Sequence, residues 1–239
     1  MLRALGLFAV AVVAGGCGSQ PATPANAGTG APAAPGPGHF GRHTQNPWFP
    51  LRPGTVYVYR GTDEGEPVRD VLTVTRRTKT IQGVRCTVIE DRLYERGRLA
   101  ERTTDWYATA DDRTVWYFGE ATATLDRGGK VDSREGSWQS GVDGAEAGIY
   151  MPGRPRVGQS GRQEFYEGHA EDHFTIVSLT QRSDTPAASS RHALLTREFT
   201  PLEPGVIDHK IYVRGIGIVI EESVKGGSEH LELVSVRRR

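Results

Sequence analysis

Apolar and polar residues alternate along most of the chain after residue 55, in segments of roughly five to ten residues. The segments 56–59, 72–75, 216–221 and 231–233 show this alternation with a period of two, which is typical of strands with one buried face. Helical periodicity is not sustained over a comparable length. The pattern predicts an all-β, mainly antiparallel domain of about 10 to 12 strands.

Turn sequences separate the predicted strands. Gly-rich or Asp-rich stretches at 110–113, 127–130 and 225–228 fit hairpin connections. A chain with this many strands must curl, close or stack to protect the edges of its sheet. We therefore expect a strongly curved sheet, a barrel or a sandwich. Residues 39–239 contain no second linker and are sufficient for one large core, so they are predicted to form a single domain.

The N-terminus has the organisation of a secretory signal. One positive charge, Arg3, precedes an apolar run over residues 4–14, which is about half of the ~20 residues needed to span a bilayer. The sequence Ala-Gly-Gly-Cys at 14–17 resembles the bacterial lipobox, and this resemblance implies that residues 1–16 are removed and that Cys17 is lipidated. The predicted location is extracytoplasmic, with the protein held at the membrane of the cell envelope by a lipid anchor at Cys17.

Residues 18–38 contain no charge and no large apolar side chain. Such a segment cannot bury enough surface to offset the entropy cost of ordering. Together with the lipidated cysteine, residues 17–38 are therefore predicted to be a Pro-, Ala- and Gly-rich tether between the membrane and the domain.

Charge and cysteine usage narrow the function classes. The chain has 29 basic and 29 acidic residues, a near-neutral balance that argues against a nucleic-acid or other polyanion surface as the main function. Lipidation of Cys17 leaves Cys86 without an intramolecular partner. Because Cys86 alternates with Val84 and Val88, we expect a buried, unreactive thiol; an exposed reactive thiol or an intermolecular disulfide is the alternative.

Five segments resemble an uncharacterised family of bacterial secreted β-rich proteins and lipoproteins. They are NPWFPLRPGTVYVYRG (46–61), RTTDWYATADDRTVWYFGE (102–120), QEFYEGHAED (163–172), TPLEPGVIDHKIYVRGIGIV (200–219) and KGGSEHLELVSV (225–236). This resemblance covers most of the domain and implies no particular activity. The final pattern of a tyrosine, Gly-x-Gly and an apolar strand is more loosely similar to envelope lipoproteins with one curved sheet, including the LolA-like carriers, which concerns the fold alone.

The segment 169–173 is the candidate metal site. On an extended strand, His169, Glu171 and His173 would point to one face, and two imidazoles with one carboxylate suit Zn²⁺ or another divalent transition metal. A solvated polar hairpin and a carboxylate-lined pocket or Ca²⁺ site that includes Glu171 and Asp172 are the alternatives. Any cofactor other than a divalent metal remains unknown.

Aromatic residues gather on two predicted neighbouring strands. Trp106 and Tyr107 lie on one, and Trp116 and Tyr117 on the other. In an adjacent antiparallel pair, alternate aromatic side chains form patches on both faces. One patch is expected in the core, whereas the other is either core as well or a surface for an apolar or sugar-like ligand.

Catalytic motifs are mostly missing from the sequence. The stretch 158–162 lacks the second glycine of a nucleophile elbow, and 215–220 departs from a dinucleotide-binding pattern. Carboxylates that could pair in space for acid–base chemistry are plentiful: Glu120, Glu164, Glu171, Asp172 and Glu203.

These observations predict a non-enzymatic envelope lipoprotein that binds or carries an apolar or sugar-like ligand or a partner protein. The alternatives are a metal- or carboxylate-dependent hydrolase and a structural component of an envelope complex.

Overall fold

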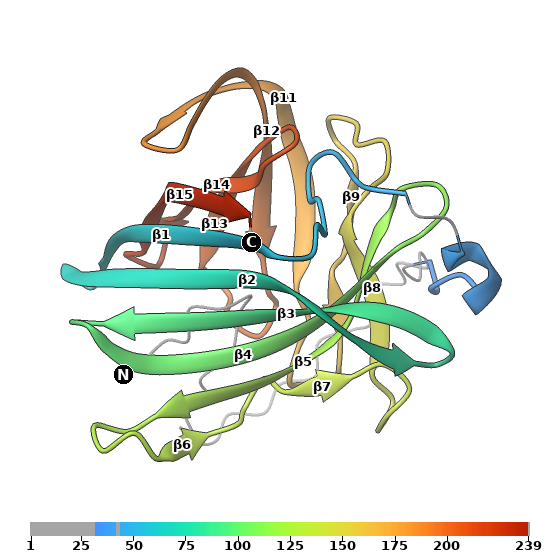
Figure 1. Cartoon of the computed structure of the whole chain (residues 1–239), viewed down its shortest axis with the longest axis horizontal. Helices are drawn as coiled ribbons and strands as arrows, with labels where there is room; N and C mark the ends of the chain where they lie inside the picture. The colour runs from blue at the N-terminus through green and yellow to red at the C-terminus, as the bar shows by residue number, and fades with distance from the viewer. Residues whose placement is uncertain (1–31, 42–43, 239) are drawn as a thin grey trace, which may run out of the picture.

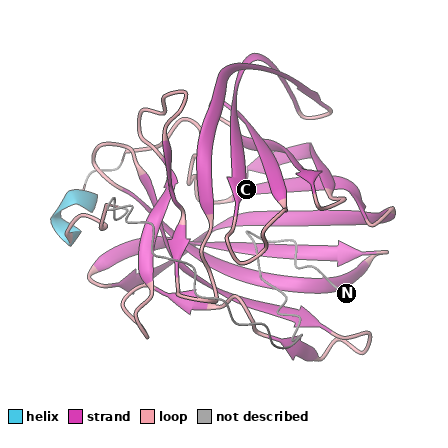
Figure 2. Cartoon of the chain, turned by 180° about the vertical axis from the view of Figure 1, so that it is seen from behind, coloured by secondary structure: helices cyan, strands magenta, loops and turns pink. Residues whose placement is uncertain are grey.

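The computed structural model of the chain describes residues 32–41 and 44–238. They form one short 3₁₀ helix, η1 (Pro37–Phe40), and otherwise strands joined by turns and loops (Figure 2). None of these residues belongs to a helix that is long and apolar enough to cross a membrane. The predicted signal peptide, residues 1–16, and Cys17 lie outside the described residues.

The strands are labelled in chain order (Figure 1). They are β1 (Thr55–Asp63), β2 (Glu66–Ile81), β3 (Val84–Glu95), β4 (Arg98–Thr109), β5 (Val115–Leu125), β6 (Val131–Ser133), β7 (Trp138–Gln139), β8 (Glu146–Met151), β9 (Ser160–Arg162), β10 (Glu164–Phe165), β11 (His173–Thr185), β12 (Ala188–Phe199), β13 (Ile207–Val213), β14 (Gly217–Lys225) and β15 (His230–Arg238).

Most strands belong to one continuous antiparallel sheet, in the order β10-β8-β5-β4-β3-β2-β1-β15-β14-β13-β12-β11-β9. The two short strands β6 and β7 also pair with β5. In Figure 1, β1 to β5 cross the front of the molecule, and β11 and β12 lie behind them. The sheet thus curves strongly around one interior.

One short stretch of chain joins the two edges of this sheet. Within residues 160–165, β9 pairs with β11 and β10 pairs with β8, and Gln163 alone separates the two strands. On β8, a Cβ atom at Gly148 would lie 2.3 Å from the carbonyl carbon of Gln163, so this close approach requires glycine. The result is a nearly closed barrel, which confirms the predicted all-β class and curved architecture.

The strand predictions agree well with the structure. Eleven strands have six or more residues, within the predicted range, and the other four have only two or three residues, too few to show alternation. The three turn sequences connect β4 with β5, β5 with β6, and β14 with β15.

One end of the barrel is sealed by the segment 46–51. The side-chain amide of Asn46 donates to the carbonyl oxygens of Arg113 (2.9 Å) and Pro152 (3.0 Å), while its oxygen accepts from the backbone of Trp48 (2.7 Å). Phe49 packs on Tyr150, with ring centroids 4.5 Å apart. The apolar cavity beneath this segment measures only about 20 Å³, room for roughly one water molecule. This end of the barrel is therefore packed core.

A second apolar cluster covers the outer face of β3, β4, β5 and β8. Its buried members are Ile81, Val84, Cys86, Val88, Trp106, Ala108, Ala110, Trp116, Phe118 and Ala147.

Residues 34–41 lie over this outer cluster. Ala34 and Phe40 pack against it, and the backbone carbonyl of His39 accepts from Asp111, 2.8 Å away. The predicted tether covers residues 17–38, so its last described part already contacts the domain.

Cys86 lies within the outer cluster, on the same face as Val84 and Val88, as predicted. Its thiol is fully buried, and this burial raises its pKa to about 12. A thiol with such a pKa holds its proton at neutral pH, so the residue has the character of a small apolar side chain.

Candidate functional site: a carboxyl-lined barrel interior

Carboxyl groups occupy inward-facing positions of the strands beside the apolar core of the barrel. Nine acidic side chains are buried among the described residues, whereas Lys210 is the single buried lysine or arginine there. The acidic residues are Asp70, Asp91, Glu101, Asp105, Glu120, Glu164, Asp172, Glu198 and Asp208. Such an excess of buried acid is unusual, because an ionised carboxylate is costly to remove from water without a partner.

The acids occupy inward positions of the strand pattern. On β2, Asp70 alternates with the buried Val68, and on β3, Asp91 lies between the buried Ile89 and Leu93. Because side chains on a strand alternate between faces, each of these carboxyls points to the same side as the core residues beside it.

Asp70 and Asp91 form a coupled pair. Burial raises the pKa of Asp70 well above its ordinary value, and the neighbouring Asp91 raises it further. Burial also raises the pKa of Asp91, while a hydrogen bond from Asp70 opposes this shift. Two carboxyls this close share a proton, because a single charge is easier to keep in the interior than two.

Asp105 on β4 and Glu120 on β5 are direct partners in the sheet. Burial raises the pKa of Asp105 to about 8, with a further contribution from Asp91, although its carboxylate accepts a 2.7 Å hydrogen bond from the Tyr117 hydroxyl. The pKa of Glu120 is raised well above its ordinary value, first by burial and then by the charge of Glu164.

Glu164 and Asp172 complete this side of the interior. One oxygen of Glu164 accepts a 2.7 Å hydrogen bond from the indole nitrogen of Trp138. Burial raises the pKa of both carboxyls, and the charge of Asp172 raises that of Glu164 further.

Lys210 on β13 is the positive centre of the interior. Its Nζ atom lies 3.2 Å from Oε2 of Glu198 and 3.0 Å from Oε1 of Glu221. Burial by itself would lower the pKa of Lys210, but the two carboxylates together raise it above its ordinary value. The side chain of Glu221 is 27% exposed, whereas those of Lys210 and Glu198 are buried.

Several carboxyl oxygens in the interior have no hydrogen-bond partner. They include Oε1 of Glu120, Oε1 of Glu164 and Oδ1 of Asp172, whose side chains are each at least nine-tenths buried. A buried acceptor without a donor costs about 1–3 kcal/mol, and more when it is charged. These oxygens could accept hydrogen bonds from a ligand with several donors, and a cation beside them would favour the ionised form of the carboxyls.

The aromatic candidates divide between the two faces. Tyr107 and Tyr117 point inward and stack, with ring centroids 4.4 Å apart. Trp106 and Trp116 belong to the outer cluster, where the Lys79 ammonium lies 3.2 Å from the ring centre of Trp106. All four side chains are buried, so the aromatic residues contribute to packing on both faces, and only the two tyrosines adjoin the carboxyl-lined interior.

The expected strand over residues 169–173 is wrong. Residues 167–169 form a turn, and Gly168 at its centre has a φ of 75°, outside the strand region.

The candidate metal ligands consequently point to different partners. Nδ1 of His169 lies 2.9 Å from Glu135, Glu171 accepts from the backbone of Gly168, and the ring of His173 stacks on Phe199. Within the described ranges, no three His, Cys, Asp or Glu side chains are arranged to hold a metal ion. These residues therefore do not provide the converging geometry on which the metal interpretation depends.

Only some of the carboxylates named in the sequence analysis lie close together in the structure. Glu120, Glu164 and Asp172 lie together in the interior, whereas Glu171 lies beside the turn at 167–169 and Glu203 belongs to the loop before β13. Sequence analysis missed the other buried acids, for which the signal is an acidic residue at an inward position of an apolar alternation. They are Asp70, Asp91, Glu101, Asp105, Glu198 and Asp208.

Comparison with known proteins gives limited similarity. No family model and no curated protein matches the chain. A protein from Bacteroides fragilis described as exported, with a YMCC-like fold, matches with a TM-score of 0.45 and 14% identity over 80% of this chain and 99% of its own. A protein described as a lipoprotein from Parabacteroides distasonis matches with a TM-score of 0.46 and 11% identity over 82% and 100%. Similarities at this level establish neither a family nor an activity for this chain.

Proposed function

We propose that this chain is a lipid-anchored binding protein of the cell envelope, whose barrel interior takes a small ligand that carries a basic amine and hydroxyl groups. The ligand is bound or carried and is not chemically changed. This proposal refines the sugar-like ligand predicted from the sequence and sets aside an apolar one, because the apolar end of the interior is filled by Phe49 and its neighbours.

The observation that carries the proposal is the set of buried, unpartnered carboxyl oxygens beside one buried lysine. Amine and hydroxyl donors would satisfy these oxygens, and an ammonium group would offset the acidic excess. The stacked rings of Tyr107 and Tyr117 adjoin the same carboxyls, and aromatic faces also attract cations.

The ligand part of the proposal is tested with two probes of similar size, glucosamine and glucose. Glucosamine should bind more tightly, because only its ammonium group complements the acidic interior. The double variant Glu120→Gln/Glu164→Gln should weaken glucosamine binding, whereas Glu167→Gln, which changes an exposed carboxylate, should not.

The proposed lipid anchor is inferred from the sequence of residues 1–17. If Cys17 is acylated, Cys17→Ser should move the protein from the membrane fraction to the soluble fraction without unfolding the domain, because residues 17–38 precede the first strand. Fractionation followed by circular dichroism of the released protein measures both. A variant that stays in the membrane fraction as completely as the wild type would contradict lipid anchoring.

A carboxylate-dependent hydrolase is the second candidate, favoured by the pair Asp70 and Asp91. A shared proton gives one carboxyl the acid form and the other the base form, as general acid–base hydrolysis requires. Turnover of a glycoside that depends on both residues would favour this alternative over simple binding.

A further inference from the structure

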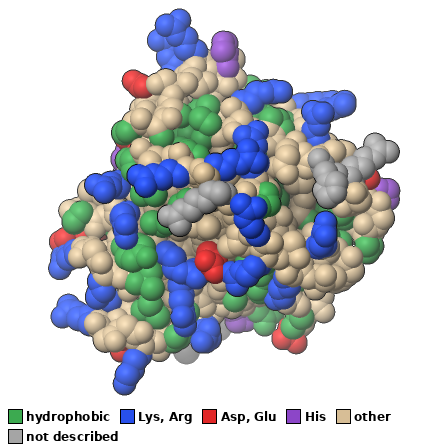
Figure 3. Space-filling view, in the orientation of Figure 1, with side chains coloured by type: hydrophobic (Ala, Val, Ile, Leu, Met, Phe, Trp, Pro, Cys, Tyr) green, Lys and Arg blue, Asp and Glu red, His purple; other side chains and the backbone are tan. Residues whose placement is uncertain are grey.

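Burial of the acids changes the charge of the molecular surface. Nine of the 29 acidic residues are buried, whereas Lys210 is the one buried base in the part of the chain that the structure describes. A chain with balanced formal charge therefore presents an excess of arginine and lysine to solvent. Figure 3 shows these side chains spread over the front of the molecule, which Figure 1 assigns to β1 to β4.

Five arginines define an outer arginine face on β1 to β4. The strand register places Arg60 directly opposite Arg69 and Arg92 directly opposite Arg102, and the face continues to Arg77. Arg60, Arg69, Arg77 and Arg102 are exposed, and Arg92 is partly exposed. Like charges on opposing positions destabilise a sheet, so an anionic partner on this face would relieve the repulsion within these two pairs.

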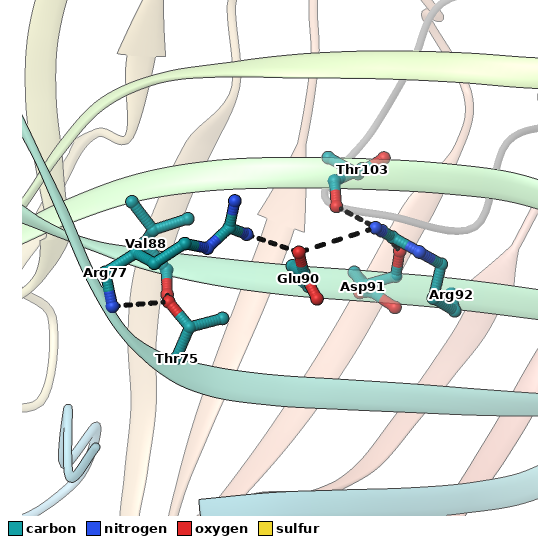
Figure 4. Close-up of polar contacts among 7 residues, drawn as sticks. All are labelled: Thr75, Arg77, Val88, Glu90, Asp91, Arg92 and Thr103. Atoms are coloured by element: carbon teal, nitrogen blue, oxygen red, sulfur yellow. Dashed lines mark hydrogen bonds and ion pairs between the residues drawn. The ribbon is translucent and has the colours of Figure 1, made fainter. Parts of the chain in front are cut away.

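Few acids on this side offset the arginines. Glu90 lies between Arg77 and Arg92 and forms ion pairs with both (Figure 4). Glu232 on β15 is opposite Arg60, and one of its carboxylate oxygens lies 3.2 Å from Nε2 of His230. The face remains positive after these contacts are counted.

The N-terminal segment lies on the same outer side of the sheet. Ala34 and Phe40 pack on the outer cluster of β3, β4, β5 and β8, next to the strands that carry the arginines. The first described residues, 32–41, therefore lie on the arginine-bearing side of the sheet.

We propose that the outer arginine face lies against the anionic headgroups of the membrane to which the protein is anchored. The proposal rests on the lipid anchor in naming that membrane as the partner. A lipid anchor at Cys17 would hold the chain at the membrane without fixing how the domain lies, whereas basic side chains near an anionic surface add an attraction that favours one orientation. In that orientation, β1 to β4 would face the lipid.

The test uses the chain without residues 1–16 and with Cys17→Ser, so that neither the signal peptide nor an acyl chain contributes. Sedimentation with vesicles of phosphatidylcholine is compared with sedimentation with an equimolar mixture of phosphatidylcholine and phosphatidylglycerol. The protein should bind the mixed vesicles more tightly, and added salt should weaken this binding.

A charge-matched pair of variants locates the contact. Arg60→Gln/Arg102→Gln should weaken binding to the mixed vesicles by about 30-fold, since each basic residue near an anionic surface contributes about 1 kcal/mol. The control Arg182→Gln/Arg191→Gln removes two exposed arginines from the β11–β12 hairpin and should have little effect.

Three results would overturn the proposal. They are equal binding to both kinds of vesicle, equal loss in the two double variants, and binding of duplex DNA without binding of anionic vesicles. The vesicle assay contains no acyl chain, so its result does not depend on lipidation of Cys17. Whether Cys17 anchors the protein is tested separately, by fractionation of the wild-type protein and of Cys17→Ser.

Discussion

Lys210→Met should lower the free energy of unfolding by about 3–5 kcal/mol, because it leaves buried carboxylates without their cation. The Nζ atom of Lys210 contacts Glu198, which is fully buried, and Glu221, which is partly exposed. With the ammonium removed, these carboxylates must take up protons or admit water, and both responses cost stability. Urea unfolding at neutral pH, followed by circular dichroism, measures the change.

Two further variants separate charge from packing. Lys210→Met/Glu198→Gln should recover much of the lost stability, because the second change removes the uncompensated charge. Lys130→Met, at the exposed turn after β5, should leave stability nearly unchanged. A Lys210→Met protein as stable as the wild type would show that the interior does not depend on this cation.

The protein should lose several kcal/mol of stability as the pH rises from about 4 to about 8. Burial raises the pKa of Glu101 to about 7 and that of Asp105 to about 8. Since these folded-state pKa values lie above those of the unfolded chain, the folded state holds more protons in this window. The stabilising contribution is therefore complete below the unfolded pKa and is lost as the pH rises through the folded pKa, at about 1.4 kcal/mol for each pKa unit.

Urea midpoints measured at acidic, neutral and basic pH test this dependence. Glu120→Gln should be more stable than the wild type at basic pH and should show a weaker pH dependence, because an amide cannot ionise beside Glu164 and Asp105. Glu167→Gln, at an exposed position, should follow the wild-type curve. Stability that rises with pH over the same window would contradict the raised pKa values.

The architecture was predictable because alternation is a local signal. Strands such as β1 and β3 alternate between buried and more exposed residues over most of their length, and turn sequences separate the strands. Closure of the barrel was not predictable, because it depends on β9 and β10, which are short, and on the close approach at Gly148. Contacts between distant segments leave no periodic pattern in the sequence.

The interior site was predictable in part. Glu120, Glu164 and Asp172 were identifiable as available carboxylates, but acids are usually solvated, so composition favours the surface for Asp70 and Asp91. Their positions along the strands indicate the opposite, because each lies two residues from a buried core residue and therefore on the inward face. The same burial explains why a neutral formal charge did not reveal the basic outer face.

The extended conformation on which the metal interpretation depends does not form, and the reason is local. That interpretation required residues 169–173 to be extended, whereas a turn at 167–169, with a φ of 75° at Gly168, includes the first of them. His169 then pairs with Glu135, and His173 stacks on Phe199.

The most direct test of ligand binding in the interior is calorimetric titration with glucosamine in two buffers that differ in their enthalpy of ionisation. A cation bound beside Asp105 and Glu120 lowers the pKa of both carboxyls, so binding at neutral pH should release protons and the measured heat should depend on the buffer. In Glu120→Gln/Glu164→Gln, both the affinity and the proton release should fall. Binding with no buffer dependence, binding unchanged in this variant, or no heat of binding at any pH would contradict the proposal.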